Sequence, residues 1–332
     1  MQIVNGVPKS ARITVSPALN RESAAAQLTG RGPIPCPGPY IVTPERIRLF
    51  AELTHNDHPI HHHDSVARDY GYPALVAPPT FAAVVMVKAQ YDAVRILAPG
   101  VAPTALLHTR QTLDIRRLLI AGDIVTTDIR IRSIRTTGEY AGVEAQLVFT
   151  DQHGEIVQSS SSSLYVCAPA VSAHPVARPY PLGGVVDRAR TLTGNRQTLR
   201  SAATSPGLPL PRRIFPVDSA DMDTYDALGT PDHYRTAAGP EAHGRPPSGM
   251  MRLALTAGYL SSCLGDPAAV ARYDAEFTHF GGQRGRAGRP VEIAGRMVSV
   301  DGTGAGIVEL DGRCLDRKLF IHAHAVLRPP AR

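Results

Sequence analysis

The pattern of apolar and polar positions predicts a short amphipathic helix near the start of the chain. Thr43–Thr54 begins with a residue type preferred at helix N-caps, and Pro44 suits the first helical position. Ile47, Phe50 and Ala51 follow at the i, i+3 and i+4 spacing of one buried helical face. The segment is therefore expected to pack as a helix against a core.

A second helix and a set of strands are predicted to follow. Thr80–Leu97 is apolar nearly all round at its beginning, as in a buried helix. The pattern then changes to β-rich runs, with a hairpin turn at Asp151–Gly154. The predicted strands are Leu106–Leu113, Ile124–Ile134, Ala141–Phe149 and Ile156–Val166.

The order of one apolar helix and then four strands occurs a second time. Met250–Leu264 is the apolar helix of this second unit. Its strands are expected at Ala271–Phe280, Pro290–Val300, Ala305–Leu310 and Lys318–Leu327. Between the units, a Pro-, Gly-, Ser- and Arg-rich stretch has no apolar period and is typical of a linker. We predict a first half with its leader at 1–172, a linker at 173–211 and a second half at 212–332.

The repeat predicts an α+β architecture. Each unit alone is a helix wrapped by an antiparallel sheet. Two such sheets joined edge to edge would form one long sheet, with both helices on its concave side.

Composition agrees with two packed cores. The chain has 332 residues, 43% of them hydrophobic and 19% charged. The net charge of +6 comes mostly from Arg residues spread along the chain. This pattern is typical of a solvated surface, or of a protein that meets an acidic partner such as CoA or a phosphopantetheine carrier. We find no nucleic-acid-binding motif.

The cysteines and the N-terminus bear on location. The four cysteines are far apart and form no C-x-x-C pair, so neither structural zinc nor a disulfide scaffold is expected, and a reducing cytoplasm fits. Met1–Val15 lacks a signal-peptide pattern, and no run approaches the roughly 18 apolar residues that cross a bilayer. We expect a cytoplasmic protein that is neither secreted nor membrane-embedded.

The densest chemical signal is the His-rich turn after the first helix. There the chain resembles the MaoC-like dehydratases and (R)-specific enoyl-thioester hydratases, whose signature runs Asp-x-Asn-Pro-(apolar)-His. The matching residues are Asn56, Asp57, His58, Pro59, Ile60 and His61. Gly71–Phe81 also resembles that superfamily, and Leu264–Thr278 looks like the catalytic subunit of two-subunit hydroxyacyl-carrier-protein dehydratases. The resemblance implies a tandem double-hotdog fold.

The resemblance also implies a reaction. A 3-hydroxyacyl thioester loses water when a base takes its α proton and an acid protonates the departing hydroxyl. His61 matches the catalytic histidine of the family and is expected to do both. Asn56 stands where the family has its catalytic Asp, and an amide can orient a hydroxyl but cannot exchange a proton with it. Asp57 could replace that carboxylate if the loop were shifted by one residue. A His-centred mechanism and a loss of hydration chemistry both remain open.

Substrate-binding groups are expected where the buried helices begin. The family presents backbone N–H groups there to polarise the thioester carbonyl, and Thr80 and Phe81 keep such groups after two prolines. Gly249 lies at the equivalent place in the second half. His233 is a weaker candidate, because Leu228 stands where the family has its Asp.

The predicted function is that of a dehydratase or hydratase acting on a 3-hydroxyacyl or 2-enoyl thioester of CoA or acyl carrier protein. The altered motif favours a specialised pathway such as polyketide metabolism. No cofactor is expected, and no metal, because consecutive histidines point in different directions. A site shared with Asp226 or Asp232 of the second half is an alternative. Two other functions remain open, a non-catalytic thioester-binding or partner subunit, and a thioesterase or cyclase using Asp57 or Asp64. A homodimer of the tandem is also plausible.

Overall fold

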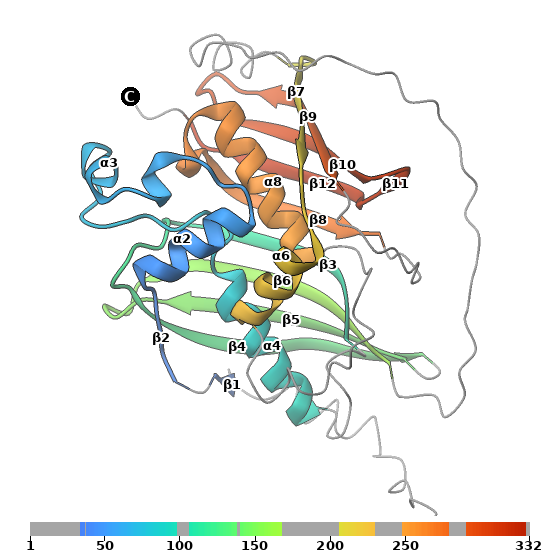
Figure 1. Ribbon diagram of the computed structural model, residues 1–332. Coiled ribbons are helices and arrows are strands. Elements are labelled where there is room, and N and C mark those ends of the chain that lie inside the picture. Colours follow the sequence, from blue (N-terminus) through green and yellow to red (C-terminus); the bar gives the residue numbers. More distant parts are fainter. Residues whose placement is uncertain are drawn as a thin grey trace, which may run out of the picture.

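Two helix-and-sheet halves share one continuous antiparallel sheet. The computed structural model describes residues 34–36, 38–97, 106–137, 140–167, 206–229, 248–278 and 290–329. The sheet has twelve strands, in the order β1-β4-β5-β6-β3-β8-β12-β10-β9-β7, with β2 paired to β4 and β11 to β10 (Figure 1). The predicted α+β double-hotdog class is confirmed.

Among the described residues, the first half contributes six strands, three α-helices and one 3-10 turn. The strands are β1 (Ile34–Pro35), β2 (Tyr40–Ile41), β3 (Leu106–Ile115), β4 (Ile124–Thr137), β5 (Tyr140–Thr150) and β6 (Ile156–Cys167). The helices are α2 (Pro44–Leu53), the 3-10 turn η1 (Pro59–His61), α3 (Asp64–Asp69) and α4 (Ala83–Leu97). Helix α2 begins as predicted, because the Thr43 side chain accepts a hydrogen bond from the Arg46 N–H.

The second half repeats this arrangement. Its strands are β7 (Pro209–Phe215), β8 (Val270–Phe277), β9 (Val291–Val300), β10 (Gly306–Cys314), β11 (Arg317–Lys318) and β12 (Phe320–Leu327). Its helices are α6 (Ser219–Gly229), α8 (Gly249–Leu264) and the 3-10 turn η4 (Pro267–Ala269). Strands β9-β10-β12-β8 follow the same order as β4-β5-β6-β3, so the repeat seen in the sequence is also a repeat of topology.

The two halves meet where β3 pairs with β8. Arg110 of β3 lies opposite Glu276 and forms a bidentate ion pair with Asp274, at 3.0 and 3.2 Å. At the other end of this pairing, Arg272 contacts Asp114 at 3.1 Å. The seam is therefore held by backbone ladders and by charge pairs between the halves.

The helices cover one face of the sheet (Figure 1). Helices of each half also contact residues of the other half. Helix α8 is buried along nearly its whole length. A Cβ on its Gly258 would lie 2.7 Å from the carbonyl oxygen of His55, just after α2. A Cβ on Gly229, at the end of α6, would lie 3.2 Å from the carbonyl oxygen of Val84 in α4. The residues just after α2 thus lie against α8 of the other half, and α6 lies against α4 of the first half.

Candidate functional site

The motif loop, residues 54–63, connects α2 to α3 and contacts the second half. Thr54 ends α2, and its hydroxyl donates to the Phe50 carbonyl at 2.6 Å. His55 then adopts a left-handed conformation with φ of 50°, which is uncommon outside glycine. Pro59 starts the short turn η1, which places His61 at its end. The turn directs His61 inward, where its side chain is completely buried.

The two ring nitrogens of His61 have different surroundings. Nδ1 lies 2.8 Å from the carbonyl oxygen of Val76. Because a carbonyl only accepts, Nδ1 must carry the proton, which leaves Nε2 with a free lone pair. Nε2 is buried and has no hydrogen-bond partner among the described residues. His61 therefore presents a buried, unprotonated nitrogen.

Burial also sets the charge of His61. Removal from water lowers its pKa to about 3, the hydrogen bond to Val76 opposes this shift, and His58 and His62 lower the pKa further. The ring is consequently neutral at physiological pH. In that state it can take a proton but has none to give from Nε2.

Asn56 is buried beside this turn and is held by its amide nitrogen. Nδ2 faces the hydroxyl of Thr54 at 2.8 Å, the carbonyl of Thr54 at 3.2 Å and the carbonyl of Ala254 in α8 at 3.4 Å. Three oxygen acceptors fix which end of the amide is nitrogen. Oδ1 is buried with no partner in the described part of the chain. Asn56 and His61 thus each offer one unoccupied acceptor.

Asp57 has a different environment from its neighbours. Its side chain is 62% exposed and forms an ion pair with Arg213 of β7 at 2.5 Å. Next to it, His55 Nε2 lies 2.8 Å from the carbonyl oxygen of Pro216. Both contacts tie the motif loop to the second half. The structure brings Asn56 and His61 into the interior and leaves Asp57 at the surface.

The start of α4 is built differently from the prediction. The helix begins at Ala83, because the prolines before it are followed by tight turns. The Phe81 N–H donates to the Pro78 carbonyl at 2.9 Å, so that donor is used within the turn. The Phe81 ring packs in the core, with its centroid 5.3 Å from that of Phe50. The Thr80 hydroxyl is buried and unpaired within the described ranges.

The structure describes one of the two binding residues that were predicted in the second half. Gly249 is the first residue of α8, and a Cβ there would come within 2.9 Å of the Phe277 ring. The Ser248 side chain caps this helix by accepting from the Met251 N–H at 3.3 Å. His233 and Asp232 lie outside the described residues.

Two buried polar residues near these elements were not predicted as functional. Gln158 of β6 donates from Nε2 to the Pro79 carbonyl at 3.4 Å, and its Oε1 is unpaired in the described structure. Tyr225 of α6 packs against Phe50 with ring centroids 5.6 Å apart, and burial raises the pKa of its hydroxyl. The signal for Gln158 was the polar run that it begins in β6, Gln158 followed by Ser159–Ser163.

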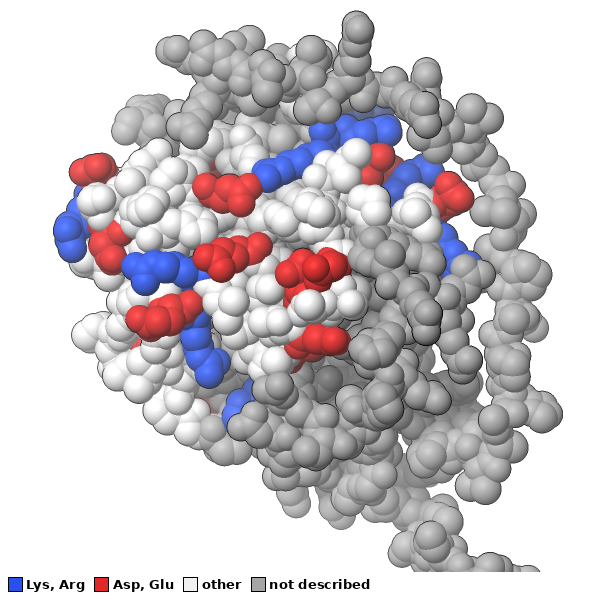
Figure 2. Space-filling model, viewed as in Figure 1, with Lys and Arg blue, Asp and Glu red and all other residues white. Residues whose placement is uncertain are grey.

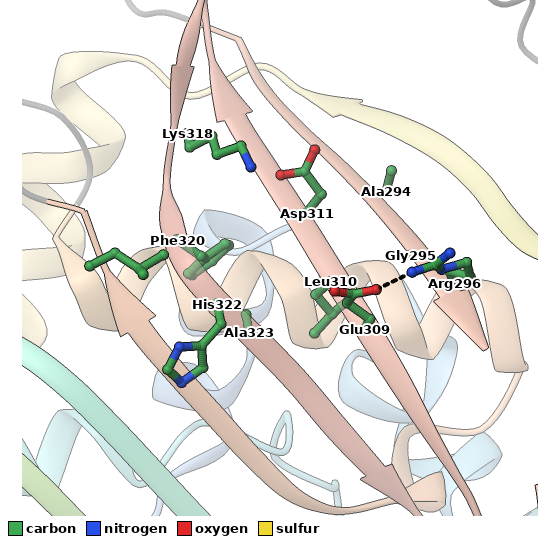
Figure 3. A pocket seen from close by; sticks show the side chains of 11 residues that line it. Ala294, Gly295, Arg296, Glu309, Leu310, Asp311, Lys318, Phe320, His322 and Ala323 are labelled. Atoms are coloured by element: carbon green, nitrogen blue, oxygen red, sulfur yellow. Dashed lines mark hydrogen bonds and ion pairs between the residues drawn. The ribbon is translucent and has the colours of Figure 1, made fainter. Parts of the chain in front are cut away.

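A cavity of about 330 Å³ lies on the face of the sheet that is opposite to the helices (Figure 3). Glu309 and Asp311 line it and are exposed, whereas Leu310 between them is buried toward the helices. Arg296 and Glu309 at its rim form an ion pair at 2.7 Å. This cavity is formed by β9–β12 and contains no residue of the motif loop.

The described surface carries charges of both signs. On the helix-bearing face, acidic and basic side chains of the described residues are interspersed without a basic stripe (Figure 2). Within the described ranges, no group of three His, Cys, Asp or Glu side chains is arranged to hold a metal. In the same ranges, no helix combines the length and apolar character needed to cross a membrane.

Sequence comparison places the first half. Residues 33–160 match the family described as FAS1-like, dehydratase domain region. A UPF0336 protein of Leifsonia xyli subsp. xyli is 34% identical over 142 residues, which make up 42% of this chain and 93% of that protein. A UPF0336 protein of Mycobacterium tuberculosis is 27% identical over 128 residues, covering 39% of this chain and 81% of that protein.

Structural comparison covers both halves. A MaoC-like dehydratase matches with a TM-score of 0.69 at 22% identity, over 89% of this chain and 97% of its own. A MaoC-like dehydratase from Phytophthora capsici has a TM-score of 0.62 at 14% identity, over 93% and 99%. A conserved hypothetical protein of Mycobacterium tuberculosis, described as having a double hotdog fold, has a TM-score of 0.58 at 12% identity, over 89% and 94%. These likenesses concern the fold.

The topology of two joined helix-and-sheet halves is that of a tandem hotdog protein, the fold that the resemblance to MaoC-like dehydratases implied. More narrowly, the chain belongs to the UPF0336 family, because it covers almost the full length of a 34% identical member. That match covers 42% of this chain.

Proposed function

We propose that the protein adds water to, or removes it from, a 2-enoyl or 3-hydroxyacyl thioester carried by CoA or acyl carrier protein. The observation that carries this proposal is the buried Nε2 of His61, which is unprotonated and unpaired among the described residues. A buried polar atom without a partner lowers stability, so its retention is more easily understood if a substrate group binds there.

In the dehydration direction, His61 Nε2 takes the proton from C2 of the 3-hydroxyacyl thioester. The C3–O bond breaks as the C2–C3 double bond forms, and the imidazolium returns its proton to the departing hydroxyl, which leaves as water. The hydrogen bond from Nδ1 to Val76 holds the ring in the required tautomer throughout. Asn56 Oδ1 accepts a hydrogen bond from the substrate hydroxyl and positions it.

The thioester carbonyl needs donors as negative charge develops on it. We assign this role to the N-terminal end of α8 at Gly249, whereas Thr80 contributes through its buried hydroxyl. Phe81 contributes through its ring, which shapes the wall of the site, since its N–H is bonded to Pro78.

The main rival is a thioester-binding subunit without activity of its own. Two features favour it. Position 56 is an amide, so no carboxylate is there to stabilise the protonated form of His61. The lowered pKa of His61 also makes its imidazole a weak base. A thioesterase acting through a carboxylate is less well supported. Asp57 is ion-paired with Arg213, and Asp64 with Arg48 at 3.3 Å, on partly exposed surface.

The test is mass-spectrometric assay of wild type, His61→Gln and Asp57→Asn on 3-hydroxyacyl and 2-enoyl thioesters of both carriers. Gln keeps an N–H that can reach Val76, so folding can be checked by circular dichroism before rates are compared. We expect a loss of about 10²-fold or more in His61→Gln, with Asp57→Asn close to wild type. Thioester binding by wild type without turnover would instead establish the binding-subunit function.

A further inference from the structure

The inner face of β6 is polar where a core strand is expected to be apolar. Gln158, Ser160 and Ser162 are successive inward positions, and all three are buried. They face helix α4, where the Ser160 hydroxyl contacts the sulfur of Met86 at 3.3 Å. On the adjacent strand β5, the buried inward residues include Leu147 and are apolar. We call Gln158, Ser160 and Ser162, with the residues they bond, the polar strip.

One end of the polar strip is internally satisfied. Gln90 of α4 donates to the Ser162 hydroxyl at 2.8 Å, and that hydroxyl donates to Gln111 Oε1 at 2.6 Å. The Gln111 amide nitrogen donates in turn to the Thr112 carbonyl at 2.6 Å. This end forms a continuous chain of hydrogen bonds and needs no ligand.

The other end is left open. Gln158 Oε1 and the Thr80 hydroxyl are both buried without a partner in the described structure. They belong to one locality, because Gln158 Nε2 donates to the carbonyl of Pro79, the residue next to Thr80. Two unpaired oxygens in one locality leave hydrogen-bonding capacity that a group able both to donate and to accept would satisfy.

This open end is close to His61 along a shared segment. His61 bonds the Val76 carbonyl and Gln158 bonds the Pro79 carbonyl. Three residues of extended chain span at most about 10 Å. The two carbonyls that anchor His61 and Gln158 therefore lie within the length of a short acyl chain of each other.

We propose that the open end binds a hydroxyl group on the acyl chain of the substrate, beyond the reacting carbons. The inference rests on the proposed function and specifies its substrate class. Gln158 Oε1 can only accept, so its ligand must donate, which a hydroxyl does and a keto group does not. The Thr80 hydroxyl then donates to the oxygen of the same group. The buried strip continues inward from this point, which favours an acyl substituent over the carrier arm that must reach solvent.

The experiment compares 3-hydroxyoctanoyl-CoA with its counterparts that carry a second hydroxyl at C5 or C7. Turnover is measured with the thioesters, and binding with unreactive thioether analogues of all three. We expect wild type to prefer at least one dihydroxy compound about tenfold, the scale of one buried hydrogen bond. Gln158→Leu should abolish that preference. Gln146→Leu, a substitution on the opposite sheet face, should retain it.

The outcomes separate the inference from the proposed function. Preferential binding of a dihydroxy analogue without turnover would support the hydroxyl site and reject the dehydratase. Turnover with no preference would reject the hydroxyl site alone. If Gln158→Leu weakened all three compounds equally, Gln158 would bind the shared pantetheine amide, and the inference would be wrong.

Discussion

The carbonyl oxygen of His55 and the α-carbon of Gly258 leave no room for a methyl group between them, since a Cβ at 258 would lie 2.7 Å from that oxygen. Alanine favours a helix over glycine by about 1 kcal/mol. Overpacking at a close backbone contact costs about 1–3 kcal/mol. We therefore expect Gly258→Ala to be destabilising, as measured by urea unfolding. Gly302→Ala, with open space around the new methyl, is the control and should be near neutral. Equal stability of the two variants would show that the motif loop moves away from the new methyl group at little cost in free energy.

The ion pair between Asp57 and Arg213 is expected to contribute little stability. The two side chains are 62% and 32% exposed, and such pairs are typically worth about 0.2–1 kcal/mol. A double-mutant cycle with Asp57→Asn and Arg213→Gln should give a coupling energy in that range that decreases with added salt. A large loss of turnover in Asp57→Asn at unchanged stability would instead assign Asp57 a role in the chemistry.

The buried, neutral His61 should make stability depend on pH. Its folded pKa of about 3 lies below the unfolded value of about 6.5, so the unfolded chain binds the extra proton between these values. The contribution is fully present above pH 6.5 and is lost as the pH falls toward 3. Between pH 7 and pH 5 the loss should be about 2 kcal/mol. Urea unfolding of wild type and His61→Gln at both pH values tests this, because the variant should lose less. If wild type and His61→Gln lost the same free energy of unfolding, protonation of the His61 ring would not destabilise the folded protein.

Restoring the family's carboxylate at position 56 is expected to fail. The Asn56 amide nitrogen faces the carbonyls of Thr54 and Ala254, which would repel a charged carboxylate. Asn56→Asp should lose about 3–5 kcal/mol at pH 7, the usual cost of an uncompensated buried charge. Because these carbonyls raise the pKa of the new acid, its deficit relative to wild type should shrink as the pH falls.

Asn56→Ala is the control for the position 56 experiment. It removes the same hydrogen bonds without adding a charge, so its deficit should not follow the ionisation of an acid. A stable Asn56→Asp with increased turnover would show that the loop can rearrange around a carboxylate.

The sequence was sufficient for the repeated architecture but not for several elements. Thr43 and Pro44 marked the start of α2 correctly, because capping is a local property. Strand β7 was not predicted, because its two prolines argue against a strand. An edge strand such as β7 tolerates proline, whereas a central strand does not. Helix α6 has a weak apolar face, so its periodicity gave little signal.

The candidate site was predictable only in part. The motif spacing made His61 and Asn56 candidates, and their burial agrees with an internal site, but local sequence gave no means of knowing which atoms would remain unpaired. Asp57 forms an ion pair with Arg213, which is 156 residues away in the chain. The open end at Gln158 likewise depends on the packing of β6 against the turn before α4. Such contacts are set by tertiary packing rather than by local pattern.

The pairing of β3 with β8 inside a single chain also determines how the protein responds to dilution. A site assembled from two separate subunits is lost when their concentration falls below the dissociation constant. Here the second half, which supplies Ala254, Gly258 and Arg213 to the motif loop, is covalently attached and has a fixed effective concentration. Pairing of these two halves around the motif loop is therefore a unimolecular event that needs no association of separate chains.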